Sequence, residues 1–201
     1  EVVIIKDGKL TDQLEVILSD FKKLYPNKFN IYGYEVNKGL GFALNYGLKK
    51  CSNELIFRMD TDDIALPERF EKQINVFKKN PKLVIVGSSI KEFNNIPGDL
   101  NQMRITALSS FEIEKNKLSR NPFNHMTVAF KKFEIESVGG YLDLPGYEDY
   151  YLWLRLLQKY KNCGYNIKEP LVYARIGNNM ISRRQGYLFF QREYFFQKKL
   201  L

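Results

Sequence analysis

Three carboxylates lie within four positions of the sequence, at Asp60, Asp62 and Asp63, directly after the apolar run 55–59. A run of this length predicts a buried strand, and the end of such a strand is where open α/β sheets place ligands. Carboxylates this close together favour a hard cation, and Mg²⁺ or Mn²⁺ shared with the phosphates of a substrate suits them. Taken alone, however, such a motif is more often a solvated acidic turn that caps the following helix.

A glycine-bearing loop at 37–41 is a second segment that suits phosphate binding. It contains Lys38 and Gly39 and leads into an expected helix over 42–50. Backbone N–H groups near a helix start can approach an anion closely, and the lysine adds a positive charge. The simpler interpretation of this loop by itself is a plain turn with two glycines.

A pair of acids, Glu148 and Asp149, opens a third segment. The helix expected over 150–160 is apolar almost all round, so it should be deeply buried and should hold the pair rigidly beside the sheet edge. The alternative is that both acids only complement the helix dipole, which contributes about 0.3–1 kcal/mol.

The rest of the chain alternates between strand-like and helix-like patterns. Strands are expected at 2–5, 29–34, 55–59, 83–86, 127–130 and 171–174, and helices at 11–25, 42–50, 67–80, 132–138 and 150–160. Residues 88–120 show weaker signals, with a helix around 111–118, and suit either an insertion that faces an acceptor or a mobile lid. The alternation predicts an α/β fold with a largely parallel sheet flanked by helices.

Composition sets further bounds. The chain has 201 residues, 44% of them hydrophobic, which suits one domain with a core of ordinary size. No apolar run approaches the roughly 20 residues of a membrane span. The net charge of +8 predicts attraction to anions such as nucleic acid, phosphorylated substrates or an anionic membrane surface.

The side chains that most often bind zinc are sparse. Cys51 and Cys163 have no metal-ligand spacing, which fits a reducing compartment and two structural thiols. His125 is the only histidine, and a lone histidine is more often structural than a ligand. At the C-terminus, residues 186–201 combine Lys and Arg with Tyr and Phe, which predicts a basic aromatic helix. Such a helix suits either an anionic membrane surface or packing against another protein segment.

The order of these motifs resembles that of the inverting glycosyltransferases of family two, which have the Rossmann-like GT-A fold that binds nucleotide sugars. The resemblance covers nearly the whole chain. It rests on Asp7-Gly8, Asn37 to Gly41 with Asn45 and Gly47, Arg58 to Asp63 with Pro67 and Arg69, Asn121-Pro122, His125 to Thr127, Gly139 to Tyr141, Glu148 to Arg155, and Arg175 to Arg184.

The resemblance implies transfer of a sugar, with inversion, from a nucleotide-diphosphate sugar to a hydroxyl group. A UDP-sugar is the favoured donor, and a glycan or polyprenyl-linked acceptor is expected, as in surface polysaccharide biosynthesis. Asp149 is the expected general base, and Glu148 the residue that orients the acceptor. Mn²⁺ or Mg²⁺ is expected on Asp62, with Asp60 beside the metal or the ribose. The expected nucleotide-sugar contacts are Asp7, Lys38, Gly39, Asp60, Asp62 and Arg183, with Arg184 as an alternative to Arg183.

The same resemblance sets the expected organisation. Residues 1–185 would form a GT-A-like domain that lacks the first strand–helix unit of the family, with an exposed sheet edge at that place. Residues 186–201 would form the C-terminal amphipathic helix. Gly177 stands where many members have a histidine available to the metal. The enzyme is expected in the cytoplasm, in peripheral contact with the inner face of the cell membrane.

Two other classes of function remain as alternatives. A metal-dependent nucleotidyltransferase uses a similar acidic strand end but does not need Glu148 and Asp149 on a distant buried helix. A non-catalytic module that binds nucleotides or polyanions is compatible with the charge of +8. Glycoside hydrolysis also uses two carboxylates but leaves the glycine loop and the acid cluster without a role.

Overall fold

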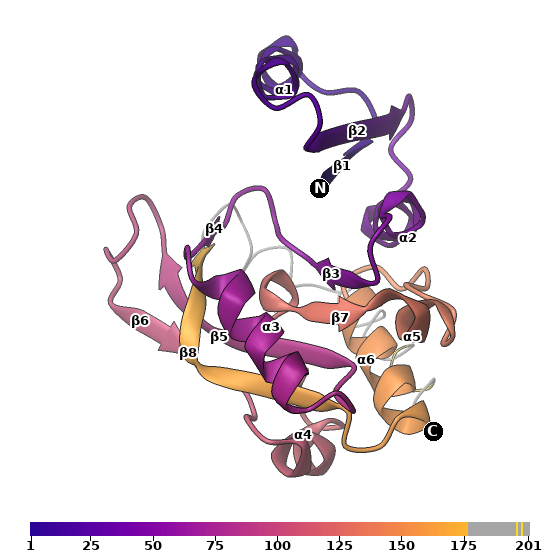
Figure 1. The fold of residues 1–201 in the computed structure, drawn as a ribbon, viewed down its shortest axis with the longest axis vertical. Coiled ribbons are helices and arrows are strands. Elements are labelled where there is room, and N and C mark those ends of the chain that lie inside the picture. The colour runs from indigo at the N-terminus through magenta and orange to yellow at the C-terminus, as the bar shows by residue number, and fades with distance from the viewer. Residues whose placement is uncertain (177–195, 197, 199–201) are drawn as a thin grey trace.

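The computed structural model describes residues 1–176 together with Phe196 and Lys198 (Figure 1). Arg183, Arg184, Gly177 and most of the predicted helix 186–201 lie outside the described residues. Phe196 is buried and stacks on Tyr147, with ring centroids 4.6 Å apart, at the start of the helix that carries Glu148 and Asp149.

A small two-stranded sheet forms the N-terminal part of the fold. β1 (Val2–Asp7) and β2 (Phe29–Tyr34) run parallel and are joined by α1 (Asp12–Leu24), whose first turn is capped by the Thr11 hydroxyl. α2 (Leu40–Lys50) follows β2, and its Gly47 lies against Ile5 of β1. No residue of α1 is fully buried, whereas Leu48 of α2 packs into the main core.

The second sheet has six strands and holds the core (Figure 1). Its strand order is β3-β7-β5-β8-β4, with β6 also paired to β5. The strands are β3 (Leu55–Phe57), β4 (Ile64–Ala65), β5 (Ile85–Phe93), β6 (Gln102–Arg104), β7 (Ala129–Lys131) and β8 (Gly164–Arg175). The accompanying helices are α3 (Arg69–Lys79), α4 (Ser110–Asn116), α5 (Lys132–Glu136) and α6 (Glu148–Lys159), with a 3₁₀ turn at His125–Thr127.

The prediction of a largely parallel sheet is wrong. Among the described strands only the pairs β1–β2 and β5–β8 are parallel, whereas β3–β7, β5–β7, β5–β6 and β4–β8 are antiparallel. The reason is that β5 continues to Phe93, beyond the strand expected at 83–86, and β6 then turns back on it as a hairpin. β7 returns along the same side of β5 after the weakly patterned region, and the helix-strand alternation does not reveal its direction.

Helices cover both faces of this sheet. On one face Phe77 of α3 packs with Val86 and Ala129. On the other face Trp153 of α6 packs with Ile85 and Phe130, so neighbouring strand residues alternate between the two faces. The apolar residues of α6 are fully buried as predicted, and each large one contributes roughly 1.5–3 kcal/mol of hydrophobic stabilisation. This burial fixes the start of α6 against the sheet.

In the described sheets β1 and β3 are edge strands, so each has one unpaired edge. Within the described part of the chain β1 pairs only with β2, and β3 pairs only with β7. The Glu1 carboxylate links the two sheets, because its Oε1 accepts hydrogen bonds from the backbone N and the hydroxyl of Ser52, both at 2.7 Å, just before β3.

Candidate active site

The acidic motif after β3 is organised by an arginine. Both guanidinium nitrogens of Arg58 donate to the two carboxylate oxygens of Asp60, each at 2.5 Å. Arg58 is buried, and α3 holds its backbone because Arg69 donates to the Arg58 carbonyl at 2.7 Å. Burial lowers the pKa of Arg69 to about 10. A bidentate pair of this kind fixes the Asp60 carboxylate in one orientation.

Asp63 is tied to the other side of the sheet. Its Oδ1 accepts from the backbone N of Arg175 at 2.7 Å, at the end of β8. The Arg175 side chain donates to the carbonyls of Asp62, at 3.3 Å, and of Asn94, at 2.7 Å. Burial raises the pKa of Asp63 to about 6, with the charges of the neighbouring acids adding to the effect. Asp63 is therefore an anchor for the loop. It does not cap the following helix as considered from the sequence, because α3 begins at Arg69 with Glu68 as its N-cap.

Asp62 differs from its two neighbours. It is exposed, and among the described residues its carboxylate has no hydrogen-bond or ion-pair partner. No group of three or more His, Cys, Asp or Glu side chains placed to hold a metal occurs within residues 1–176, 196 and 198. One free carboxylate beside a fixed one fits a Mg²⁺ or Mn²⁺ site of the open kind, in which substrate phosphates and water complete the coordination.

Asp149 lies on the first turn of α6, where protein atoms surround it although part of its surface stays exposed. Burial raises the pKa of its carboxyl above the ordinary value, while a hydrogen bond from Asn121 and the charge of Arg58 oppose the shift. The Asn121 Nδ2 atom donates to Asp149 Oδ2 at 2.8 Å. A carboxylate whose proton affinity is raised in this way suits a general base.

Tyr141 is buried beside His125. Burial raises the pKa of its hydroxyl, with smaller effects from the charge of Arg58, which lowers it, and from those of Asp149 and Asp60, which raise it. The Tyr141 hydroxyl lies 3.0 Å from Nε2 of His125, and burial lowers the pKa of that histidine. The prediction that His125 is structural agrees with this buried contact.

Asp7 and Gly39 meet at the start of α2. The Asp7 carboxylate accepts from the backbone N–H groups of Lys38, at 2.7 Å, and Gly39, at 3.1 Å. The Lys38 ammonium lies over the rings of Phe42 and Tyr34, 4.6 and 5.3 Å from their centroids. In this structure an acid of the chain thus occupies the N–H groups that the sequence offered to a phosphate, and Asp7 holds the loop in place.

Glu148 faces the same loop. Its Oε2 accepts from the backbone N of Gly146 at 2.8 Å, and burial raises its pKa. Gly41 at the start of α2 packs against Glu148 and the carbonyl of Leu142. The structure therefore places Glu148 beside the glycine loop, whereas Asp149 faces Asn121.

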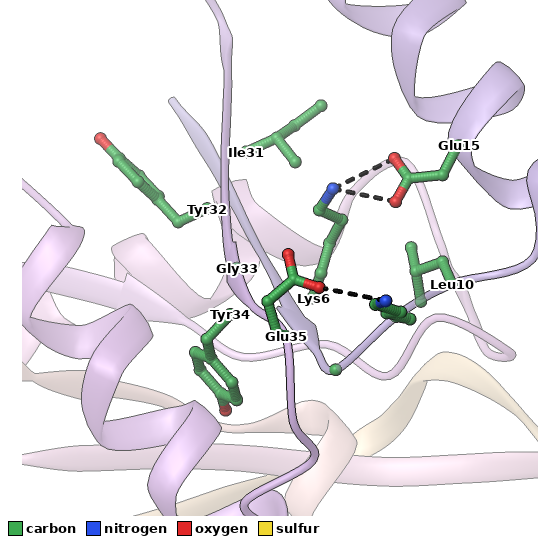
Figure 2. Close-up of a pocket in the computed structure, with 10 residues that line it drawn as sticks. Lys6, Leu10, Glu15, Ile31, Tyr32, Gly33, Tyr34 and Glu35 are labelled. Atoms are coloured by element: carbon green, nitrogen blue, oxygen red, sulfur yellow. Dashed lines mark hydrogen bonds and ion pairs between the residues drawn. The ribbon is translucent and has the colours of Figure 1, made fainter.

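A pocket of about 490 Å³ opens at the ends of β1 and β2, and none of the predicted site residues lines it. Its charged groups are paired, because Lys6 contacts Glu15 at 2.9 Å and Lys9 contacts Glu35 at 3.5 Å (Figure 2). Lys6 and Asp7 point to opposite faces of β1, which explains why Asp7 is absent from the lining. Paired charges give this pocket little attraction for a diphosphate.

Four residues of the site had no assigned role in the sequence prediction. Arg58 stands inside an apolar run, and a charge at such a position is a signal of a buried ion pair. Asn45, Asn121 and Tyr141 act through hydrogen bonds between residues far apart in the chain, which no local pattern reveals.

Comparison with known proteins identifies the family of this chain. Residues 1–138 match the pattern of the family described as glycosyl transferase family 2. Over 186 residues the chain is 44% identical to an uncharacterised glycosyltransferase of Haemophilus influenzae, covering 92% of this chain and 68% of that protein. It is 41% identical to the UDP-Gal:alpha-D-GlcNAc-diphosphoundecaprenol beta-1,3-galactosyltransferase of Escherichia coli, covering 92% and 66%. The chain thus spans about two thirds of the length of these relatives.

Solved structures show the same fold at low sequence identity. The mannosyltransferase PcManGT from Pyrobaculum calidifontis, in complex with GDP-Man and Mn²⁺, gives a TM-score of 0.65 at 15% identity, covering 96% of this chain and 59% of that one. TarS residues 1–349 of S. aureus, in complex with UDP-GlcNAc, gives 0.64 at 20% identity, covering 96% and 55%.

The α/β fold is thus that of the GT-A glycosyltransferases, and the predicted α/β, GT-A fold class is confirmed apart from the strand directions described above. The chain belongs to glycosyl transferase family 2, as the resemblance implied. None of the helices in the described residues has both the length and the apolar character that crossing a membrane requires.

Proposed function

We propose that this chain carries the donor site and the general base of an inverting, metal-dependent glycosyltransferase. The enzyme transfers a sugar from a UDP-sugar to a hydroxyl of a glycan or lipid-linked acceptor, as in surface polysaccharide biosynthesis. The observation that carries the proposal is the pairing of a fixed carboxylate, Asp60, with the exposed carboxylate of Asp62 directly after β3, in a chain that matches this family. The Escherichia coli relative, whose name gives both a UDP-sugar and a diphosphate-linked lipid acceptor, supports the choice of substrates.

The donor side of the site rests on the loop after β3. Asp62 holds the metal ion, Mn²⁺ or Mg²⁺, and Asp60, fixed by Arg58, lies beside the metal and the ribose. When bound, the ion neutralises the negative charge that develops on the departing diphosphate. The PcManGT structure, a complex with GDP-Man and Mn²⁺, supports a divalent ion in this fold.

The Lys38 ammonium supplies positive charge to the diphosphate once the lysine side chain moves off the rings of Tyr34 and Phe42. Asp7 and Gly39 fix the turn from which Lys38 projects, so in this proposal Asp7 acts on the nucleotide through the loop. Arg183 is the proposed closing residue over the diphosphate, and it lies outside the described residues.

The acceptor side rests on the start of α6. Asp149 takes the proton from the acceptor hydroxyl while that oxygen attacks the anomeric carbon, opposite the departing diphosphate, which inverts the configuration. The raised pKa of Asp149 increases its affinity for this proton. Glu148, held by the Gly146 N–H group, orients the acceptor. A lipid-linked acceptor implies peripheral contact with an anionic membrane, to which the net charge of +8 is suited.

The deciding experiment supplies UDP-galactose, UDP-glucose, UDP-N-acetylglucosamine, GDP-mannose and TDP-glucose in turn, with Mn²⁺ and the α-linked hexyl diphosphate of N-acetylglucosamine as acceptor. It measures the nucleoside diphosphate released and the anomeric configuration of the new glycosidic bond. We expect diphosphate release with inversion, dependent on Asp149. Release of pyrophosphate from a nucleoside triphosphate and a sugar phosphate would instead identify a nucleotidyltransferase. The family match favours the first result.

A further inference from the structure

A groove of about 280 Å³ lies next to Asp149 and has no role in the donor site. One wall is the segment 105–107, between β6 and α4, and the other is formed by Asn116 and the segment 119–122. Its volume is close to the lower end of the range of small-molecule sites, about 300 Å³, so it has room for roughly one sugar ring.

Asn121 connects the groove to the proposed base. It lines the groove, and its Nδ2 atom donates to Asp149 Oδ2 at 2.8 Å, while its Oδ1 accepts from the backbone N of Phe123 at 3.2 Å. Next to Asp149, the hydroxyl of Tyr150 donates to the carbonyl of Lys117 at 2.7 Å. Two bonds from the first turn of α6 therefore hold the loop that forms this wall. A hydroxyl group bound beside Asn121 lies next to the carboxylate that is to accept its proton.

The two walls are also held to each other. Asn166 of β8 is fully buried, and its Nδ2 atom donates to the carbonyl of Ala107 at 2.7 Å and to that of Pro122 at 2.9 Å. One side chain thus spans both walls from the sheet. The groove is preformed, which reduces the entropy that a ligand loses on binding.

The lining combines three kinds of group. The Asn116 Nδ2 atom donates to the Glu112 carbonyl and the Ser119 hydroxyl donates to the Asn116 carbonyl, so Asn116 Oδ1 and Ser119 Oγ can still accept hydrogen bonds from sugar hydroxyls. Thr106 is 7% exposed, and its hydroxyl has no hydrogen-bond partner among the described residues. Ile105 and Pro122 give an apolar edge.

Arg120 adds a positive charge to this lining. It is exposed, and its guanidinium forms no ion pair within the described part of the chain. The lysines of the larger pocket differ, because Glu15 and Glu35 pair with them. A free guanidinium at the rim of a polar groove is suited to a phosphate oxygen pair.

We propose that this groove is the acceptor subsite and that it takes a sugar ring whose neighbouring group is a phosphate, bound by Arg120. The assignment rests on the proposed function and deepens it, since it names the acceptor class and the residues that select it. The phosphate belongs either to a lipid diphosphate or to a phosphodiester within a glycan. Both present the same oxygens to Arg120.

The test measures equilibrium binding by calorimetry, with three probes for each of N-acetylglucosamine, glucose and galactose. The probes are the α-linked hexyl diphosphate, the hexyl phosphodiester and the neutral hexyl glycoside. For at least one sugar we expect the phosphate probes to bind about tenfold more tightly than the neutral one, the value of one charge-assisted hydrogen bond. Whichever phosphate probe binds more tightly identifies the source of the phosphate.

Arg120→Gln is expected to abolish this difference without changing binding of the neutral glycoside. Lys115→Gln, on exposed α4 outside the groove, is the matched control and should retain the difference. Ser119→Phe, which fills the groove, should weaken binding of all probes. The proposal is overturned if wild-type protein binds none of the probes, if it binds charged and neutral probes equally, or if Arg120→Gln leaves the preference intact.

UDP-galactose binding and Mn²⁺-dependent diphosphate release are measured on the same protein samples. If the wild type turns over the donor but Arg120→Gln leaves the preference for phosphate probes unchanged, only the groove assignment is contradicted. If the wild type shows no donor turnover but still prefers the phosphate probes, the proposed function is contradicted and the groove remains a phosphosugar site.

Discussion

Asn45 and Tyr141 hold each other by two hydrogen bonds across almost half of the chain. The Asn45 Nδ2 atom donates to the Tyr141 carbonyl at 2.6 Å, and the Tyr141 N–H donates to Asn45 Oδ1 at 2.9 Å. Gly140, at φ +63°, precedes Tyr141, and a Cβ there would overlap with Asn45 Oδ1. This clamp fixes α2, which begins at the proposed donor loop, to the loop that leads into α6.

Asn45→Ala should destabilise the protein by about 1–3 kcal/mol, because it leaves the Tyr141 N–H and carbonyl without their partners. Urea unfolding gives the change in the free energy of unfolding. Asn75→Ala on α3 is the control, since Asn75 is exposed. A change in stability no larger than that of the control would show that the clamp contributes little.

Asp60→Ala and Asp62→Ala should differ in their effects on stability and on Mn²⁺-dependent donor binding. Removal of Asp60 leaves the buried Arg58 cation unpaired, which costs about 3 kcal/mol, at the low end for a buried pair because the Asp60 side chain is 35% exposed. Removal of Asp62 should leave stability nearly unchanged but abolish Mn²⁺-dependent donor binding. Thermal unfolding and calorimetry with a UDP-sugar, each with and without Mn²⁺, distinguish the two. Asp20→Ala, on exposed α1, serves as the control, and unchanged metal dependence in Asp62→Ala would exclude Asp62 as a ligand.

Asp149→Asn should abolish transfer while donor binding stays nearly intact. In the wild type the transfer rate should rise with pH as Asp149 ionises, at a pH above the ordinary range of an aspartate, because burial raises its pKa. Initial rates across pH at saturating donor measure this. Turnover retained in Asp149→Asn would rule out Asp149 as the base.

The same raised pKa predicts a stability difference. In the unfolded chain Asp149 ionises at about pH 3.9, whereas in the folded protein it ionises only at higher pH. The protonated carboxyl therefore stabilises the folded state fully below about pH 3.9, and this stabilisation is lost as pH rises through the folded pKa. Asp149→Asn, which never ionises, should therefore become more stable than the wild type over this window and keep the advantage at neutral pH. The prediction would be refuted if the difference in unfolding free energy between Asp149→Asn and the wild type were the same at pH 3 and pH 7.

Asp7→Ala should cost about 1 kcal/mol, the usual value of an N-terminal cap, because the Lys38 N–H group loses its acceptor, whereas the Gly39 N–H group keeps Asn37 Oδ1. Asp7→Asn keeps one acceptor oxygen and should cost less. Donor affinity measured on both variants shows whether Asp7 only anchors the loop or contacts the nucleotide base directly. A large loss of affinity in Asp7→Asn at unchanged stability would favour direct contact.

Local patterns predicted most of the elements. The apolar residues of α6, the capped start of α1 and the strand before Asp60 all lie where spacing and residue type placed them. Strand direction was not predictable in the same way, because the directions of β6 and β7 depend on how the chain between the strands returns to β5. The nine-residue length of β5 was missed since its second half contains Ser88, Ser89 and Lys91, which lower the hydrophobic signal.

The candidate site was predicted in its residue types more than in its contacts. The sequence shows three similar aspartates, whereas the structure gives Asp60 to Arg58, Asp63 to the backbone of Arg175, and leaves Asp62 exposed. These differences arise from partners up to 112 positions away, which a local motif does not contain.

The parallel ladder of β5 and β8 joins residues about 80 positions apart, so a long loop must close before these strands can pair. Asn166, which holds the groove, and Arg175, which anchors Asp63, both belong to β8. The refolding rate of this protein should therefore be limited by the docking of one late strand. Until that strand docks, the acidic loop and the acceptor groove stay unassembled, and the order of folding makes both halves of the site appear together.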